Sequence, residues 1–231
     1  MNTPLLKINT LLILIMLAGA SLVSSCSKGS DDINYAALTF IHASPGLPPI
    51  DIYVDGSRTN GNRIIAYTDT IPYKFISTGS HLIAVNKNIS SIIYISKNFD
   101  FDPESYYSMF ITGKHDSVTY VMTRDNMTAP ADGKAKLRFL NLSPDAPPLD
   151  FRISSSSGLF AGLAFKSYSE FTQVEPGEYT MGIYEQGNPE PLAEENITID
   201  KGVFYTIWAK GLLASQDEET KLGLQTVAIE Q

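Results

Sequence analysis

Residues suited to metal binding, cross-linking and covalent catalysis are scarce in this sequence. Its 231 residues include one Cys and three His, too few for a zinc site, an iron–sulfur cluster or a disulfide scaffold. The nucleophile-elbow, metalloprotease and phosphate-loop motifs are also absent from the sequence. We therefore expect no metal site, no cofactor and no catalytic residue, and we predict that the protein is not an enzyme.

Positive charge is in short supply as well. The sequence holds 17 Lys and Arg residues against 25 Asp and Glu, and its formal net charge is −8. Because an acidic surface repels phosphate backbones, this balance argues against nucleic-acid binding. Hydrophobic residues make up 43% of the chain, which is enough for one or two packed cores and too much for a disordered protein.

The apolar run at residues 11–18 falls short of the roughly 20 residues that a membrane-spanning helix needs. It follows Lys7 and precedes small residues, which is typical of a secretory signal peptide. Residues 22–26 (LVSSC) resemble a bacterial lipobox, in which cleavage precedes the cysteine. We predict a signal peptide over residues 1–25 and membrane anchoring through diacylglycerol and palmitate-type chains on Cys26. The alternative is an ordinary secretory signal followed by an incidental cysteine.

Residues 26–34 are polar and short-chained, so we predict a flexible tether. Asp31 and Asp32 resemble an acidic signal that exports some lipoproteins to the outer face of the outer membrane. A solvated linker with two chance acids explains them equally well. We expect a lipid-anchored protein of the cell envelope, at the outer membrane, with surface exposure left open.

The rest of the chain contains an internal repeat. Residues 36–54 and 135–153 are identical at eight of nineteen positions, at an offset of 99. At an offset of 98 the correspondence continues through Gly79/Gly177, Tyr107/Tyr205 and Gly113/Gly211. This period is too long for a solenoid, so each copy should be a domain. We predict a first domain over residues 35–124, a linker over 125–134 and a second domain over 135–231.

Short β-rich runs separated by Gly, Pro and Asn recur in both copies. The predicted strands are 37–43, 50–54, 73–76, 81–85, 91–96, 106–112 and 117–122, then 136–142, 149–153, 171–174, 179–184, 195–199, 203–209 and 223–229. Apolar residues alternate along several of them, as in a half-buried strand. The pattern predicts an all-β protein of two tandem antiparallel β-sandwich domains, immunoglobulin- or transthyretin-like.

One motif occurs in both copies. It comprises Ser44, Pro45, Pro48, Pro49 and Asp51 in the first, and Ser143, Pro144, Pro147, Pro148 and Asp150 in the second. Prolines cannot donate to a strand ladder, so the motif should end one strand and lead into the next. We expect Ser44 and Asp51 to hydrogen-bond loop amides. The alternative, a calcium site, needs six to eight oxygens, usually from several close acids.

The three histidines lack partners for catalysis or metal binding. The second copy has Asn141 where the first has His42, so we expect His42 to be a hydrogen-bonded residue beside a strand. His81 and His115 have no companions at metal-ligand spacing. None of the three therefore enters our candidate site.

Residues 42–56 (HASPGLPPIDIYVDG) resemble the opening of the domain-of-unknown-function family 4397. Residues 141–151 (NLSPDAPPLDF) resemble it again, with Asn in place of the His. Residues 174–179 (VEPGEY) and 204–207 (FYTI), the latter with Gly211, are similar to later family motifs. The resemblance implies tandem bacterial extracellular β-domains in a lipoprotein, and it implies no established activity.

Aromatic residues are the remaining indication of function. The following set includes more aromatic residues than a small core requires: Tyr53, Tyr67, Tyr73, Tyr94, Tyr106, Tyr107, Tyr168, Tyr184 and Trp208. Exposed aromatic rings stack on sugars, whereas half-buried tyrosines are common in strands. We predict a non-catalytic binding or adhesion module whose partner is a glycan or an envelope protein. The alternative is a structural envelope lipoprotein without a small ligand, and an exposed aromatic patch in one copy alone would favour binding.

Overall fold

A computed structural model describes residues 34–153 and 159–229 of the chain. The described part consists of β-strands and connecting loops, with no α-helix. It therefore contains no helix that is long and apolar enough to cross a membrane. The predicted signal peptide, Cys26 and nearly all of the tether lie outside the described residues. The described residues belong to one compact unit.

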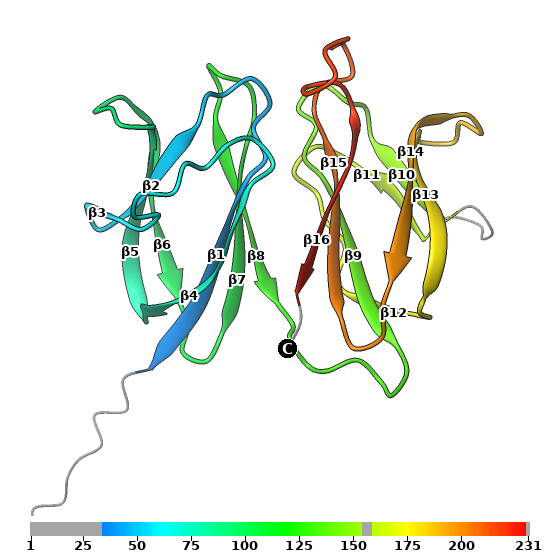
Figure 1. The fold of residues 1–231 in the computed structure, drawn as a ribbon, viewed down its shortest axis with the longest axis horizontal. Helices are drawn as coiled ribbons and strands as arrows, with labels where there is room; N and C mark the ends of the chain where they lie inside the picture. Colours follow the sequence, from blue (N-terminus) through cyan, green and yellow to red (C-terminus); the bar gives the residue numbers. More distant parts are fainter. Residues whose placement is uncertain (1–33, 154–158, 230–231) are drawn as a thin grey trace, which may run out of the picture. The chain divides into compact units, whose positions relative to one another are not determined.

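The strands form two sandwiches of two four-stranded sheets each (Figure 1). The first contains β1 (Tyr35–His42), β2 (Ile50–Val54), β3 (Ser57–Arg58), β4 (Thr70–Ser77), β5 (Gly79–Lys87), β6 (Ile93–Phe101), β7 (Tyr106–Thr112) and β8 (Thr119–Asp125). The second contains β9 (Ala135–Asn141), β10 (Leu149–Ile153), β11 (Phe160–Leu163), β12 (Thr172–Val174), β13 (Gly177–Glu185), β14 (Pro191–Ile199), β15 (Phe204–Lys210) and β16 (Gly223–Ile229). The all-β sandwich prediction is confirmed.

The two sandwiches have the same topology. In the first, the sheet orders are β4-β1-β7-β8 and β3-β2-β5-β6, and in the second they are β12-β9-β15-β16 and β11-β10-β13-β14. Most neighbouring strands are antiparallel as predicted, but β1 pairs parallel with β7 and β9 pairs parallel with β15. The sequence prediction missed β3 and β11, because a two-residue strand shows no alternation and Gly162 interrupts β11 at φ +68°.

Successive side chains of β1 point alternately to the core of the first sandwich and to the outer face of its sheet. Leu38 and Phe40 face the core between the two sheets of the first sandwich. Ile41 belongs instead to a separate cluster between the two sandwiches. Because side chains alternate along a strand, Tyr35 and Thr39 lie on this outer face as well. The outer face of sheet β4-β1-β7-β8 is therefore partly covered by the second sandwich.

Corresponding positions of the two copies meet in the inter-sandwich cluster. It contains Ile41, Ala43, Phe110 and Val121 from the first sandwich and Leu140, Leu142 and Trp208 from the second. Ile41 and Leu140 are equivalent at an offset of 99, and Phe110 and Trp208 at an offset of 98. The rings of Phe110 and Trp208 touch edge-on, with centroids 5.9 Å apart. The sandwiches thus meet as subunits of an isologous dimer do, with the same patch on both sides.

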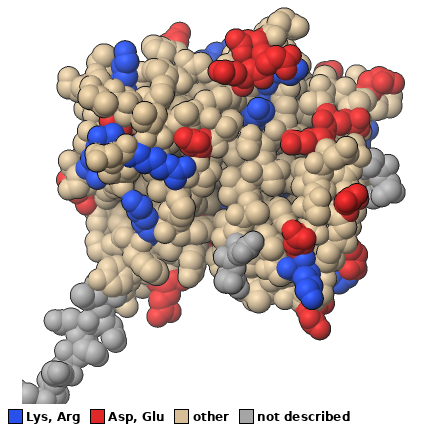
Figure 2. Space-filling model, in the orientation of Figure 1, with Lys and Arg blue, Asp and Glu red and all other residues tan. Residues whose placement is uncertain are grey.

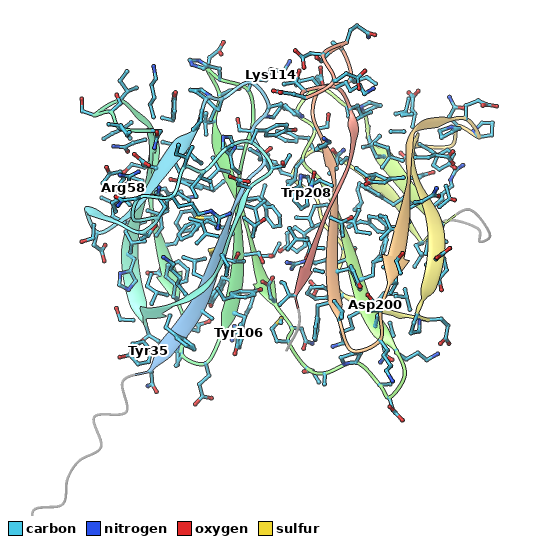
Figure 3. The ribbon with its side chains drawn as sticks, viewed as in Figure 1. Tyr35, Arg58, Tyr106, Lys114, Asp200 and Trp208 are labelled. Carbon is cyan, nitrogen blue, oxygen red and sulfur yellow. The ribbon has the colours of Figure 1, made fainter. Side chains whose placement is uncertain are left out.

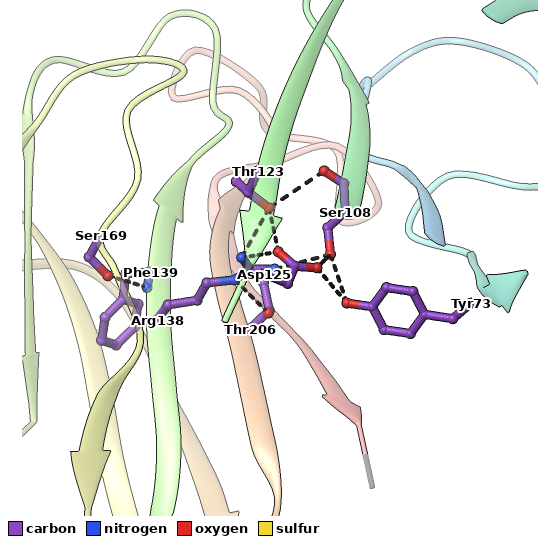
Figure 4. A network of polar contacts seen from close by, with 8 residues as sticks. All are labelled: Tyr73, Ser108, Thr123, Asp125, Arg138, Phe139, Ser169 and Thr206. Carbon is purple, nitrogen blue, oxygen red and sulfur yellow. Dashed lines mark hydrogen bonds and ion pairs between the residues drawn. The ribbon is translucent and has the colours of Figure 1, made fainter. Parts of the chain in front are cut away.

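A buried ion pair joins the sandwiches beside this cluster (Figure 4). Arg138 Nη1 lies 2.5 Å from Asp125 Oδ1, and both side chains are buried. The guanidinium also donates to Thr123 Oγ1 at 3.0 Å and to Ser108 Oγ at 3.1 Å. Tyr73 donates its hydroxyl to the second oxygen of Asp125. Burial and the Asp125 charge raise the pKa of Tyr73, which keeps this donor protonated.

Candidate functional site

The repeated motif lies buried at the junction of strands in each copy. Ser44 donates its hydroxyl to the Gly113 carbonyl at 2.6 Å, which ties the loop after β1 to the end of β7. This differs from the expected bond to a loop amide, since Ser44 acts as a donor. In the second copy the Ser143 hydroxyl lies 3.4 Å from Asp145 Oδ1. That the whole motif has a structural role stays a prediction.

Asp51 is a buried carboxylate surrounded by donors. Its Oδ1 accepts from Arg58 Nη2 at 2.5 Å, Asn60 Nδ2 at 3.0 Å and Asn88 Nδ2 at 2.9 Å. Its Oδ2 accepts from the Ile89 amide at 2.8 Å, as expected for a residue that holds a loop. Burial raises the pKa of Asp51, but these hydrogen bonds together outweigh burial and lower it. The carboxylate oxygens already have protein donors, which leaves little capacity for a calcium ion.

Asp150 holds the corresponding loops of the second copy. It accepts from the Gly162 amide at 2.8 Å, the Gly187 amide at 3.3 Å and Arg152 Nη2 at 3.1 Å. Gly187 is the counterpart of Ile89 at an offset of 98, and both have a positive φ, +79° and +51°. Glycine adopts this conformation freely, whereas a β-branched residue is strained in it. Both aspartates therefore hold a hairpin by the amide of a residue with positive φ. In the first copy this residue is Ile89, whose backbone is strained.

His42 is the last residue of β1 and is fully buried. The sequence analysis expected a hydrogen-bonded residue beside a strand and did not predict its burial. Its Nδ1 accepts from the Ser44 amide at 3.4 Å, and its Nε2 faces the Pro48 carbonyl at 3.5 Å. An imidazole that accepts at one nitrogen and donates at the other is neutral. Burial lowers the pKa of His42 from 6.5 to about 4, so the ring stays neutral at physiological pH.

Asn141 makes the same two bonds in the second copy. Its Oδ1 accepts from the Ser143 amide at 3.1 Å, and its Nδ2 donates to the Pro147 carbonyl at 3.4 Å. Amide and neutral imidazole thus supply the same pair of one acceptor and one donor. This exchange explains why His in one copy aligns with Asn in the other.

A surface cluster of Ser77, His81 and Asp55 resembles a catalytic triad in its order. His81 Nδ1 lies 2.5 Å from Asp55 Oδ2, and Nε2 lies 3.2 Å from Ser77 Oγ. However, Nε2 also lies 2.9 Å from the Ser77 carbonyl oxygen, which only accepts. A nitrogen that donates there has no free lone pair to take a proton from the hydroxyl, as a general base must. The cluster is a hydrogen-bonded corner between β4 and β5.

The structure divides the candidate aromatics into buried and exposed residues. Trp208 is buried between the sandwiches and Tyr107 lies in the first core, so neither is free to stack on a sugar. Tyr106 is 37% exposed. Two aromatics that the sequence analysis did not select are more exposed: Phe75 at 78% and Tyr35 at 46%.

Tyr35, Phe75 and Tyr106 form an exposed aromatic patch on the outer face of the first sandwich. Ala37 pairs with Phe75 on one side and with Tyr106 on the other, so the small side chain lies between two rings. The rings of Tyr35 and Phe75 are 6.1 Å apart. Tyr35 begins β1 and Tyr106 begins the parallel β7, so both lie at the same end of the sheet (Figure 3).

The second sandwich has no such patch at the equivalent positions. The repeat offsets and the strand register place Lys134, Gln173 and Phe204 there. Phe204 is buried. Lys136, the counterpart of Ala37, lies with Nζ 5.4 Å from the Phe204 ring centroid. A long side chain therefore covers the ring that corresponds to Tyr106.

Charge also distinguishes the two sandwiches. Residues 34–125 contain seven Lys and Arg against eight Asp and Glu, whereas residues 135–231 contain seven against fourteen. Acidic side chains are prominent on the second sandwich in Figure 2. The aromatic patch thus belongs to the nearly neutral sandwich, where no strong field selects a charged ligand.

The fold and the patch define a tandem β-sandwich protein with one solvent-facing aromatic surface. The chain belongs to the family described as Domain of unknown function (DUF4397), which matches residues 36–152. The match is a single segment that covers the first sandwich and extends through most of β10. That the second sandwich is a further copy of the family domain stays a prediction. No curated protein matches the sequence.

Several solved structures resemble the chain weakly. A family CBM26 module from Eubacterium rectale Amy13K, solved with maltoheptaose, is 10% identical, covers 84% of this chain and 97% of its own, and has a TM-score of 0.28. A streptococcal virulence factor that binds α-glucan is 10% identical, with coverages of 78% and 92% and a TM-score of 0.25. A family 41 carbohydrate-binding module from streptococcal virulence factors is 12% identical, with coverages of 73% and 92% and a TM-score of 0.24. Likeness at this level says nothing about the ligand of this chain.

Proposed function

We propose that the protein is a lipid-anchored, non-catalytic binding module of the cell envelope, and that the aromatic patch binds a neutral glycan. The observation that carries the proposal is the asymmetry between the copies. Both sandwiches have the same strand order, yet Phe75 is replaced by an exposed Gln173 in the second. The fold therefore does not require an aromatic ring at this position.

The chemistry of the patch suits a sugar. The CH faces of a pyranose ring pack on aromatic rings, and tyrosine hydroxyls supply hydrogen bonds at the rim. Ala37 is itself buried, and because it has no side chain beyond Cβ it does not cover the flanking rings of Phe75 and Tyr106. Phe75 buries its apolar surface only when a partner covers it, and this burial contributes a favourable free energy to binding.

The N-terminal segment limits where the ligand lies. If Cys26 carries the lipid, eight residues separate it from Tyr35, the first residue of β1 and a member of the patch. A fully extended segment of that length spans about 30 Å at most. The patch would therefore stay close to the membrane surface, so the proposed ligand is a glycan of the envelope itself.

The test is a glycan array followed by titration calorimetry on residues 34–231. We expect Phe75→Ala and Tyr106→Ala each to weaken binding about three- to tenfold, because one stacked ring contributes about 0.5–1.5 kcal/mol. The matched control is Tyr168→Ala, which removes a 40% exposed tyrosine of the second sandwich. A blank array, or equal losses in all three variants, would overturn the proposal, and capture of an envelope protein instead would replace the glycan as partner.

A further inference from the structure

The interface between the sandwiches has two halves that differ in composition. Its two sides use equivalent positions, so each contact has a counterpart in the other half. Thr39 corresponds to Arg138 at an offset of 99. Tyr106 pairs with Asp125, and its counterpart Phe204 pairs with Ile229, so Ile229 corresponds to Asp125. The buried ion pair of one half is thus replaced by Thr39 and Ile229 in the other.

In the half of the interface that contains the ion pair, Arg138 fills the space between sheet β12-β9-β15-β16 and sheet β4-β1-β7-β8. Its guanidinium carbon lies 4.4 Å from the ring centroid of Phe171. It hydrogen-bonds Thr206 of its own sandwich at 2.9 Å and reaches Asp125 of the other. A planar group stacked on an aromatic ring therefore occupies this half.

In the other half, a groove remains where the arginine would lie. Its volume is about 500 Å³, within the range of small-ligand sites, roughly 300–1,000 Å³. The residues that line it are Thr39, Thr70, Pro72, Tyr73, Val227, Ala228 and Ile229. Tyr73 is the counterpart of Phe171 at an offset of 98, so the aromatic wall is kept while the cation and its carboxylate partner are not.

The lining of the groove indicates a neutral occupant with hydroxyl groups. None of the seven lining residues carries a charge. The Asp125 carboxylate that Tyr73 contacts is already paired with Arg138, so the groove offers no free counter-charge. The Thr70 hydroxyl is buried without a hydrogen-bond partner in the described part of the chain. An unpaired buried hydroxyl is costly, and a turn of the Thr70 side chain toward the groove would let it pair with a ligand hydroxyl.

The groove adjoins the aromatic patch on the same face. Thr39 lies two residues beyond Ala37 on β1, so both side chains point to the outer face. The rings of Tyr73, in the groove, and Tyr106, in the patch, are 5.4 Å apart. A chain of sugars that stacks on the patch can therefore continue into the groove.

We propose that this groove is an additional subsite that binds one end of the glycan on the aromatic patch, with a sugar ring stacked on Tyr73 in place of the missing guanidinium. The inference rests on the proposed function. It adds that the ligand is a neutral oligosaccharide, because a monosaccharide cannot cover the patch and the groove together.

The decisive variant rebuilds the missing ion pair. The double substitution Thr39→Arg with Ile229→Asp fills the groove with a copy of the contact between Arg138 and Asp125. A second variant, Ile229→Trp, narrows the groove by a single substitution at a half-buried residue of the lining, and it buries no new charge. The probes are neutral malto- and chito-oligosaccharides from disaccharide to heptasaccharide, titrated by calorimetry into residues 34–231 of each variant.

For the wild type we expect affinity to rise with chain length until the groove is reached. Both groove variants should lose about tenfold on the longest oligosaccharide that binds and keep wild-type affinity for the shortest. Phe75→Ala should weaken every length. If the groove variants match the wild type at every length while Phe75→Ala does not, the subsite is refuted and the patch stands. If no probe binds the wild type, or if Phe75→Ala also binds normally, both proposals fail.

Discussion

His42 makes the stability of the first sandwich depend on pH, and replacing it by Asn should remove that dependence. The substitution introduces the residue that the second copy uses at the same position, Asn141. An amide supplies the acceptor for the Ser44 amide and the donor for the Pro48 carbonyl, as Asn141 does for its own motif. Unlike imidazole, it does not titrate.

The magnitude follows from the pKa of the buried ring. In the folded protein the pKa of His42 is about 4, against 6.5 for a free histidine. Between these values the unfolded chain binds a proton that the folded chain does not, so acid favours unfolding. At about 1.4 kcal/mol per pH unit, this one group removes about 3 kcal/mol as the pH falls from 7 to 4. Above pH 7 its contribution is constant.

The assay is urea unfolding of residues 34–231, wild type and His42→Asn, at a series of pH values from 7.5 to about 4. Acids elsewhere titrate equally in both proteins, so only the difference between the two unfolding free energies is interpreted. Any cost of the smaller side chain is the same at every pH. We expect the difference to shift by about 3 kcal/mol in favour of Asn as the pH falls. Parallel stability curves, or an NMR pKa of His42 near 6.5, would refute the reasoning.

Three further outcomes are expected. Arg138→Met should destabilise the chain by about 3–5 kcal/mol in urea unfolding, because it leaves the Asp125 carboxylate buried and unpaired; the double variant with Asp125→Leu should recover most of that loss, and no recovery would contradict this. Ile89→Asn should stabilise the protein by about 0.5–1 kcal/mol in the same assay, since Asn tolerates φ +51° and the replaced side chain is 84% exposed; a loss of stability would show that the Ile makes a favourable contact. Cys26→Ala should move the protein from the membrane to the soluble fraction in cells, and unchanged partitioning would exclude lipidation at this residue.

The strands and the duplication of the fold were predictable, because both follow from patterns that are visible in the sequence. Alternating apolar residues mark a half-buried strand wherever they occur, and an internal repeat implies the same fold twice. The antiparallel prediction left out the parallel pair of β1 and β7, since the sequence does not show which distant strands become neighbours. The ion pair of Arg138 and Asp125 was missed for the same reason, and Asp125 even falls within the expected linker.

The aromatic patch was only partly predictable, because exposure depends on neighbouring side chains. Tyr106 was among the candidates, but its exposure depends on Ala37, whose counterpart Lys136 covers Phe204 in the other copy. Trp208 also lies on an outer sheet face, yet the other sandwich covers it. A position-by-position comparison of the two copies, with Phe75 against Gln173, is the signal in the sequence that could have revealed the patch.

NMR chemical-shift mapping with the tightest-binding neutral oligosaccharide tests the central claim most directly. The claim is that one face of the first sandwich binds a glycan. The account predicts that the largest shifts fall on the aromatic ring signals of Phe75 and Tyr106 and on backbone amides of β1, β4 and β7. Shifts confined to the second sandwich, or to the loops at the opposite end of the first, would contradict it.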